Sequence, residues 1–132
     1  MILDNQTKFS ALQAVTASAA STNYYDNQVA GDAYDNELYL VCRVGTAFAT
    51  LTNLTISIQT DDNTSFSSAT TLASSPAIVL ASLTADTEVF KVRVPKGLER
   101  YFQVYYTVGG SNATAGTIDA FLVKDIQQAI TN

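Results

Sequence analysis

The chain has 132 residues, which fits one domain, and 47% of them are hydrophobic, enough for a sizeable core without disulfides or metal. The formal net charge of −5 has the wrong sign for binding nucleic acid or an anionic membrane surface, so we expect neither as a partner. Histidine is absent and cysteine occurs once, which excludes the commonest general base, the most-used zinc ligand and an intrachain disulfide.

The N-terminal residues and the overall hydropathy bear on location. Residues 1–4 contain no apolar run of signal-peptide length, and no stretch of the sequence approaches the length of a membrane-spanning segment. We therefore expect a protein that is made and used in soluble form. Charged residues make up only 14% of the chain, which predicts a polar but thinly charged surface.

Hydrophobic periodicity along the chain is mostly two, which indicates β-strands. Residues 12–15 and 20–25 are weaker strand candidates, and residues 7–14 also permit a helix. Residues 124–130 are compatible with a short terminal helical turn. Clear strands are predicted at residues 38–44, 54–59, 77–83, 88–94, 100–108 and 117–123, with turn-forming residues between them.

Alternation within the predicted strands identifies the side chains that should be buried. In residues 54–59, Leu54, Ile56 and Ile58 face one way and polar residues face the other, as in an antiparallel strand with one solvated face. In residues 38–44, Cys42 lies on the apolar face, where a thiol usually fills the core and is chemically inert.

About eight short strands separated by turns are typical of an all-β sandwich or barrel. We therefore predict a single-domain, jelly-roll-like antiparallel β-sandwich of about eight strands over residues 1–132. Residues 1–10 precede the first clear strand and are predicted to form an N-terminal arm.

No pattern of residues points to catalysis, and we expect no catalytic residues, no cofactor and no resident metal. The densest acidic cluster lacks the spacing and the glycine of an EF-hand, so a solvated loop is favoured over a cation site. Asp61 and Asp62 are adjacent and precede Asn63, which favours a turn over a catalytic carboxylate pair. The acidic cluster consists of Asp26, Asp32, Asp35 and Glu37.

Tyrosines and basic residues are the remaining candidates for binding. We expect the tyrosines either to pack within the strands, to stack on sugars or bases, or to anchor a protein interface, where this residue type is enriched. Four basic residues in one hairpin-like stretch form either a solvated turn or a patch for an acidic protein surface. These residues are Tyr24, Tyr25, Tyr101, Tyr105 and Tyr106, and Lys91, Arg93, Lys96 and Arg100.

Several blocks of the sequence, in order, resemble the small capsid cement (decoration) proteins of tailed bacteriophages with HK97-like capsids. The blocks are residues 1–4, 9–23, 38–41, 54–72 and 94–102. The resemblance implies a jelly-roll sandwich that assembles as a homo-oligomer, a dimer or a trimer. It also implies a place on the outer surface of an icosahedral virion, where the protein, made in the host cytoplasm, bridges neighbouring subunits of the major capsid protein.

The capsid or oligomer contacts are predicted from exposed apolar positions. Ile2, Leu3 and Phe9 precede the first clear strand and need something to cover them, and Tyr24 and Tyr25 are further candidates for contact with the capsid or another copy. A different function remains open, namely a carbohydrate-binding jelly-roll module on a virion or cell surface. A hydrolase is disfavoured because histidine is absent.

Overall fold

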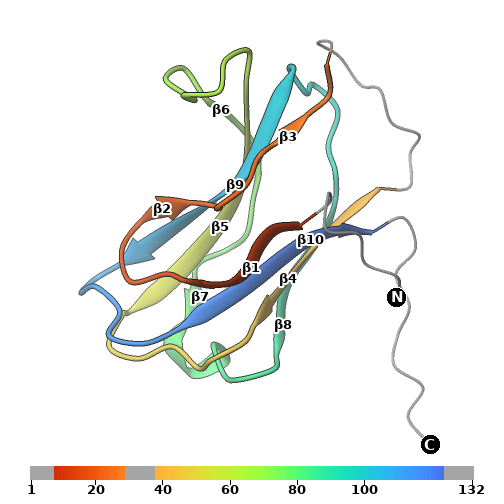
Figure 1. Cartoon of the computed structure of the whole chain (residues 1–132). Coiled ribbons are helices and arrows are strands. Elements are labelled where there is room, and N and C mark those ends of the chain that lie inside the picture. The colour runs from red at the N-terminus through yellow and green to blue at the C-terminus, as the bar shows by residue number, and fades with distance from the viewer. Residues whose placement is uncertain (1–7, 29–37, 124–132) are drawn as a thin grey trace, which may run out of the picture.

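The computed structural model describes residues 8–28 and 38–123, which form two antiparallel β-sheets packed face to face (Figure 1). The predicted all-β antiparallel sandwich is therefore confirmed. Within the described ranges, no helix has the length and apolar character needed to cross a membrane. The strands are β1 (Lys8–Ala14), β2 (Ala19–Ala20), β3 (Tyr25–Asp26), β4 (Tyr39–Val44), β5 (Asn53–Asp61), β6 (Thr70–Ser74), β7 (Ile78–Val79), β8 (Glu88–Arg93), β9 (Tyr101–Gly109) and β10 (Thr117–Val123), and a 3₁₀ turn, η2 (Leu80–Ser82), follows β7.

The two sheets pair strands that are distant in the sequence. Sheet A has the strand order β1-β10-β4-β8, and sheet B has the order β2-β9-β5-β6, with β3 also paired to β9 and β7 to β5. The longest pairing joins β5 to β9 from Asn53 opposite Gly109 to Asp61 opposite Tyr101. Because this register is continuous, the side chains of β5 and β9 alternate in step between the inner and outer faces of sheet B.

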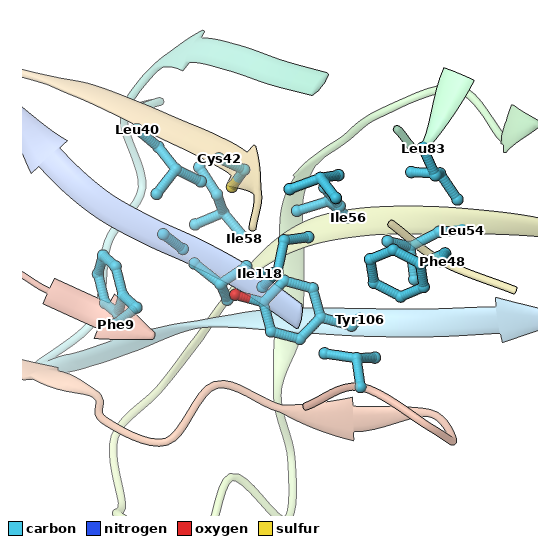
Figure 2. Close-up of a cluster of buried hydrophobic side chains, with 14 of the residues drawn as sticks. Phe9, Leu40, Cys42, Phe48, Leu54, Ile56, Ile58, Leu83, Tyr106 and Ile118 are labelled. Atoms are coloured by element: carbon cyan, nitrogen blue, oxygen red, sulfur yellow. The ribbon is translucent and has the colours of Figure 1, made fainter. Parts of the chain in front are cut away.

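The main core lies between the sheets and is filled by alternate residues of the strands. Leu54, Ile56 and Ile58 of β5 are buried as the alternation predicted, and they face Leu40 and Cys42 of β4 (Figure 2). Full burial of each Leu or Ile side chain stabilises the fold by about 1.5–3 kcal/mol relative to exposure. This apolar contact between the sheets holds the sandwich together.

A second, smaller hydrophobic cluster lies on the other face of sheet A. It consists of Val41 of β4 and Phe121 and Val123 of β10, with Tyr39 packed against them. These residues alternate with core residues along the same strands, so β4 and β10 are apolar on both faces. The double-sided burial explains why residues 38–44 lack a fully polar face.

The beginning of the chain differs from the sequence-based expectation. The helix permitted by residues 7–14 is wrong, because Lys8–Ala14 is strand β1, paired with β10. The predicted arm of residues 1–10 overlaps this strand at residues 8–10, while residues 1–7 and 124–130 lie outside the described residues. Register shifts around Ser10 break the alternation of β1, and this is why its sequence lacks a clear period of two.

Two other predicted strands are shorter in the structure. Residues 20–25 do not form one strand, because β2 and β3 pair separately with β9 and are divided by irregular residues. Residues 77–83 form strand only at Ile78–Val79. The chain then turns through η2, where the N–H of Leu83 donates to the carbonyl of Leu80, and this turn directs the Leu83 side chain into the core.

Candidate functional site

An aromatic patch, defined as Tyr24, Phe66 and Tyr101, lies on the outer face of sheet B. The Tyr24 side chain is 47% exposed. Its ring centroid lies 5.5 Å from that of Tyr101 at 88° and 6.1 Å from that of Phe66 at 60°. Such edge-to-face pairs add about 0.5–1.5 kcal/mol beyond simple area burial. The three rings therefore support one another at the surface.

The adjacent tyrosine has the opposite orientation. The Tyr25 ring lies 5.4 Å from the ring of Phe102, a fully buried core residue. Neighbouring residues of an extended chain point to opposite faces, so the structure sends Tyr24 outward and Tyr25 toward the core. Of the two tyrosines that the sequence singled out, Tyr24 is the surface candidate.

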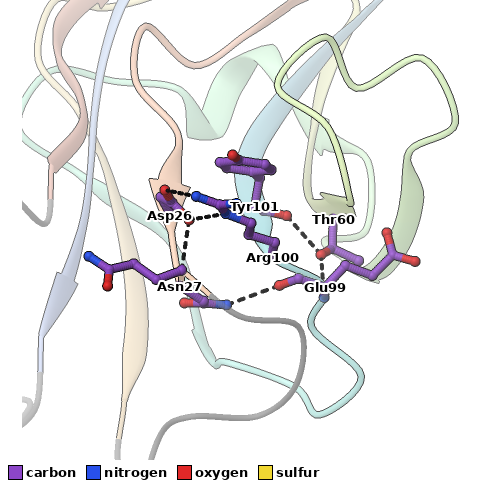
Figure 3. Close-up of polar contacts among 7 residues, drawn as sticks. Asp26, Asn27, Thr60, Glu99, Arg100 and Tyr101 are labelled. Atoms are coloured by element: carbon purple, nitrogen blue, oxygen red, sulfur yellow. Dashed lines mark hydrogen bonds and ion pairs between the residues drawn. The ribbon is translucent and has the colours of Figure 1, made fainter.

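A charge pair borders the aromatic patch. Arg100 Nε donates to Asp26 Oδ1 at 2.9 Å and Nη2 donates to Oδ2 at 3.2 Å, while the guanidinium carbon lies 5.0 Å from the centroid of the Tyr101 ring (Figure 3). The hydrogen bond from Arg100 lowers the pKa of the Asp26 carboxyl, and the same bond raises the pKa of Arg100. The two-pronged geometry fixes the guanidinium plane against the tyrosine ring.

Hydrogen bonds between side chains and the backbone hold the end of β9 that carries Tyr101. Thr60 Oγ1 donates to the carbonyl of Tyr101 and accepts the N–H of Glu99, both at 2.8 Å. Asn27 Nδ2 donates to the carbonyl of Glu99 at 3.1 Å (Figure 3). These hydrogen bonds connect β3, β5 and the start of β9. They fix the position of the end of sheet B that carries the aromatic patch.

The turn after β5 positions the third ring. Asp61 Oδ1 accepts the N–H of Asp62 at 2.6 Å, and Oδ2 accepts the N–H of Ser68 at 2.8 Å. Burial raises the pKa of the Asp61 carboxyl, but these backbone hydrogen bonds outweigh it and hold the pKa below its ordinary value. The predicted turn at Asp61 and Asp62 is confirmed, and it places Phe66 beside Tyr24.

The middle of the same outer face is uncharged. Gln103 Nε2 donates to Gln59 Oε1 at 3.1 Å, and the hydroxyls of Ser57 and Ser74 lie 3.2 Å apart. Gln103 points outward yet is only 7% exposed. The registers of β5, β6 and β9 place on this surface, which we call the neutral face, residues Thr55, Ser57, Gln59, Thr71, Ser74, Gln103, Tyr105 and Thr107.

Leu12 is an exposed apolar residue on the edge strand of sheet A, and it is not among the contacts predicted from the sequence. Its side chain is 62% exposed and its φ of 47° lies in the left-handed region, which is unfavourable for leucine. The N–H of Leu12 donates to Asp119 Oδ1 at 2.7 Å, which holds the bulge of β1 in place. In the sequence Leu12 lies between Ala11 and Gln13, and nothing in this pattern marks its side chain as exposed.

The other predicted contact residues fall in different places. Phe9 is 2% exposed and its ring lies 5.4 Å from that of Phe102, so Phe9 belongs to the core. The prediction that Phe9 needs an external cover is therefore wrong, because sheet B covers it. Ile2 and Leu3 lie outside the described residues.

The structure also places Cys42 and the basic and acidic residues that the sequence singled out. Cys42 is fully buried, and burial raises the pKa of its thiol, which confirms the predicted core cysteine. Arg100 borders sheet B, whereas Lys91 and Arg93 lie on β8 of sheet A, so these three basic residues are divided between the two sheets. In the acidic cluster, Asp26 binds Arg100 and the other members lie outside the described residues.

Two further features limit the chemistry of the described surface. A small gap lined by apolar side chains that include Phe9, Phe102 and Leu122 has no room for a water molecule, so it is not a ligand pocket. Across residues 8–28 and 38–123, no three acidic or thiol side chains gather closely enough to hold a metal ion. The features best suited to binding are therefore the aromatic patch, the neutral face and Leu12.

Comparison with known proteins identifies the family. The model of the Bbp16 family matches residues 9–122, from β1 to β10, and the chain therefore belongs to the Bbp16 family. The match includes both sheets, the aromatic patch and Leu12. No curated protein matches the chain.

Proposed function

We propose that this member of the Bbp16 family is a structural virion protein, a capsid cement (decoration) protein of a tailed bacteriophage. It binds the outer surface of an icosahedral capsid and bridges neighbouring subunits of the major capsid protein. The resemblance of residues 1–4, 9–23, 38–41, 54–72 and 94–102 to such proteins supports the proposal. In this function the protein acts by binding alone, without a catalytic step.

The aromatic patch is the observation that carries the proposal. Tyrosine and arginine are the residue types enriched at the energetic centres of protein interfaces. Here Tyr24, Tyr101 and Arg100 lie together, and each is held by another group before any partner arrives. A pre-arranged surface loses little side-chain entropy on binding, so even a small patch can contribute strongly to affinity.

A bridging protein needs a second binding surface, and Leu12 provides one. Leu12 lies on β1 of sheet A, whereas the aromatic patch lies on sheet B. A left-handed backbone at a leucine costs about 1–2 kcal/mol, and strain of this kind concentrates at functional sites. We assign Leu12 to contact with one capsid subunit and the aromatic patch to contact with its neighbour.

Binding to the assembled shell then stabilises that shell by mass action. A ligand that binds only one state contributes RT ln(1 + [L]/Kd), which is about 2.7 kcal/mol when its concentration is 100 times Kd. Many identical copies add such contributions over the whole capsid. Modest affinity at each position is therefore enough to raise the resistance of the shell to heat or internal pressure.

The test measures occupancy on shells assembled from the major capsid protein of the same phage. Wild-type protein should co-sediment with the shells and raise their melting temperature. Tyr24→Ala should raise Kd about 30-fold, the effect of losing a 2 kcal/mol anchor, whereas Tyr24→Phe keeps the ring and should bind almost as well. Failure of the wild-type protein to bind the shells would contradict the proposed function.

The two surfaces are tested separately by the same assay. Leu12→Ser should lower occupancy without changing the fold, because Leu12 is 62% exposed in the monomer. Ala11→Ser, at the neighbouring exposed position of β1, is the matched control and should bind as the wild type does. If both Tyr24→Ala and Leu12→Ser bind normally, the assignment of these surfaces is wrong.

A carbohydrate-binding module on a virion or cell surface is a second candidate function. The exposed ring of Tyr24 favours it, because sugars stack on aromatic rings. A glycan array tests this alternative. Saturable binding that Tyr24→Ala abolishes would support it, and an array without any binder would exclude it for the sugars present.

A further inference from the structure

We infer that Gln13 is a positioning residue, which fixes the two proposed capsid contacts relative to one another. Its carboxamide holds both the bulge of β1 that presents Leu12 and the chain that leads to Tyr24. The inference rests on the proposed function for the premise that both residues contact the capsid, and it goes further in naming the group that joins them. The hydrogen bonds that carry it lie between β1 and the connecting segment, defined as residues 21–24 between β2 and β3 (Figure 1).

The carboxamide of Gln13 joins β1 of sheet A to the connecting segment. Its Oε1 accepts hydrogen bonds from the N–H and the hydroxyl of Thr22, at 2.9 and 3.0 Å. Its Nε2 donates to the carbonyl of Ala20, the last residue of β2, at 2.9 Å. An amide carries both the acceptor and the donor that these backbone groups need. One side chain of sheet A therefore holds the chain on both sides of Ser21.

The same carboxamide oxygen is anchored in the core. Ser10 Oγ donates to Gln13 Oε1 at 2.6 Å and lies 2.8 Å from the hydroxyl of Tyr106 on β9. Because the serine hydroxyl has one hydrogen, which it gives to Gln13, the Tyr106 hydroxyl donates to Ser10. Ser10 and Tyr106 are both fully buried, so water does not compete for these bonds. The position of the Gln13 carboxamide is thereby fixed from sheet B as well as from its own strand.

The bulge that exposes Leu12 lies between two members of this network. The second register shift of β1 falls between Ser10 and Gln13, and Leu12 directly precedes Gln13. The left-handed backbone of Leu12, with a φ of 47°, persists only where surrounding contacts hold it. Ser10 and Gln13 hold it from within β1, and Asp119 of β10 accepts the N–H of Leu12. The network therefore maintains the conformation that presents the Leu12 side chain.

The connecting segment transmits the restraint to Tyr24. The N–H of Asn23 donates to the carbonyl of Phe9 on β1 at 3.0 Å. On the side of sheet B, the N–H of Ser21 donates to the carbonyl of Val104 at 2.7 Å, and Ser21 Oγ accepts the N–H of Val104 at 3.2 Å. The chain just before Tyr24 is therefore bonded to both sheets, and Gln13 supplies the side-chain part of the bond to β1.

A fixed separation between two contacts increases the affinity of a bridging protein. Once one contact is bound, the other binds at an effective concentration that depends on how well the separation matches the two sites. A loose connection between the contacts lowers this effective concentration without changing either contact. Gln13 therefore contributes to affinity only when Leu12 and Tyr24 are both engaged, and this dependence distinguishes positioning from a general effect on stability.

Double-mutant cycles on the assembled shells test the inference. Gln13→Ala should raise Kd for the shells about 10-fold, and Gln13→Asn should do the same because its shorter side chain does not reach Thr22. In a Leu12→Ser or a Tyr24→Ala background, Gln13→Ala should change Kd by less than about 2-fold, because no second contact remains to be positioned. Ile58→Val, which truncates a core side chain of β5, controls for lost stability and should bind as the wild type does.

Amide hydrogen exchange measures the connection without any capsid. In Gln13→Ala, the N–H groups of Leu12 and Asn23 should both exchange at least about 10-fold faster, although neither is bonded to Gln13 in the wild type. Thr84→Ala is the control. It deletes a hydrogen bond of 2.7 Å to Thr87, in the turn before β8, and should leave both exchange rates unchanged.

Two results would overturn the inference. One is a loss of affinity from Gln13→Ala that is equal in the wild type and in both contact backgrounds. The other is unchanged exchange at Leu12 and Asn23 in Gln13→Ala. A wild-type protein that does not bind the shells contradicts the proposed function alone, because the exchange rates still decide whether Gln13 joins the two surfaces.

Discussion

Replacing Phe9 with alanine tests whether this residue belongs to the core or to an external contact. Its ring is 2% exposed and packs against the ring of Phe102 at a centroid distance of 5.4 Å and an interplanar angle of 57°. Truncation of a buried phenylalanine removes its transfer free energy and leaves a cavity, at a cost of about 3–5 kcal/mol. We therefore expect Phe9→Ala to lower the free energy of unfolding by that amount.

The expected change in melting temperature follows from the size of the domain. For a chain of this length, 1 kcal/mol corresponds to about 4 °C, so Phe9→Ala should melt about 12–20 °C below the wild type. Calorimetry and urea unfolding followed by circular dichroism measure the effect, with all proteins at one concentration. Phe9→Leu keeps most of the volume and should cost less than about 1.5 kcal/mol.

Tyr24→Ala is the matched surface control for this experiment. It also removes an aromatic ring, but one that is 47% exposed, and the loss of its two ring pairs should lower the free energy of unfolding by about 1–2 kcal/mol, less than Phe9→Ala does. A melting temperature of Phe9→Ala within about 3 °C of the wild type would refute the placement of Phe9 in the core. It would return Phe9 to the list of external contacts.

Three further predictions concern single groups. The buried thiol of Cys42, whose pKa is raised by burial, should not react with Ellman's reagent at pH 8 in the folded protein and should react fully in guanidinium; rapid labelling of the native state would disprove its burial. Tyr106→Phe deletes a buried hydrogen bond of 2.8 Å to Ser10 and should cost about 1 kcal/mol in urea unfolding, whereas an unchanged midpoint would mean that the bond contributes nothing. Arg100→Gln should raise the pKa of Asp26 toward its ordinary value, measured by NMR. In the wild type the stabilising contribution of this pair is present above the unfolded pKa and is lost as the pH falls through the lowered, folded pKa, so an identical Asp26 titration in both proteins would contradict the pairing.

Most of the strands could be predicted because their burial follows local alternation. Residues 38–44, 88–94, 100–108 and 117–123 each contain one of the longer strands of the structure or nearly all of it, and residues 54–59 lie within the longer β5. Strand β1 was predicted only in part, as the weaker candidate at residues 12–15, because its bulges shift the register twice and Leu12 has a left-handed backbone there. A bulge changes which face each following residue occupies, so the period of two disappears from the sequence.

The candidate site could be predicted only in part. Tyr24 stood out as an aromatic residue in a polar setting, but nothing local distinguished it from Tyr25, since either face of an extended segment can be the buried one. Asp26 and Arg100 are 74 residues apart in the sequence, and only the pairing of β3 with β9 brings them together. Phe66 joins the patch because the turn after β5 folds back over the sheet.

By itself, the sequence determined the class of protein. Its short alternating segments favour an antiparallel sandwich, its charge disfavours nucleic acid and anionic membranes, and its lack of histidine and single Cys42 restrict the chemistry. Only the tertiary structure decided which faces of the strands are exposed, because that choice depends on how the sheets pack against each other. Packing buried Phe9, exposed Tyr24 and Leu12, and separated the charged strands of sheet A from the neutral face of sheet B.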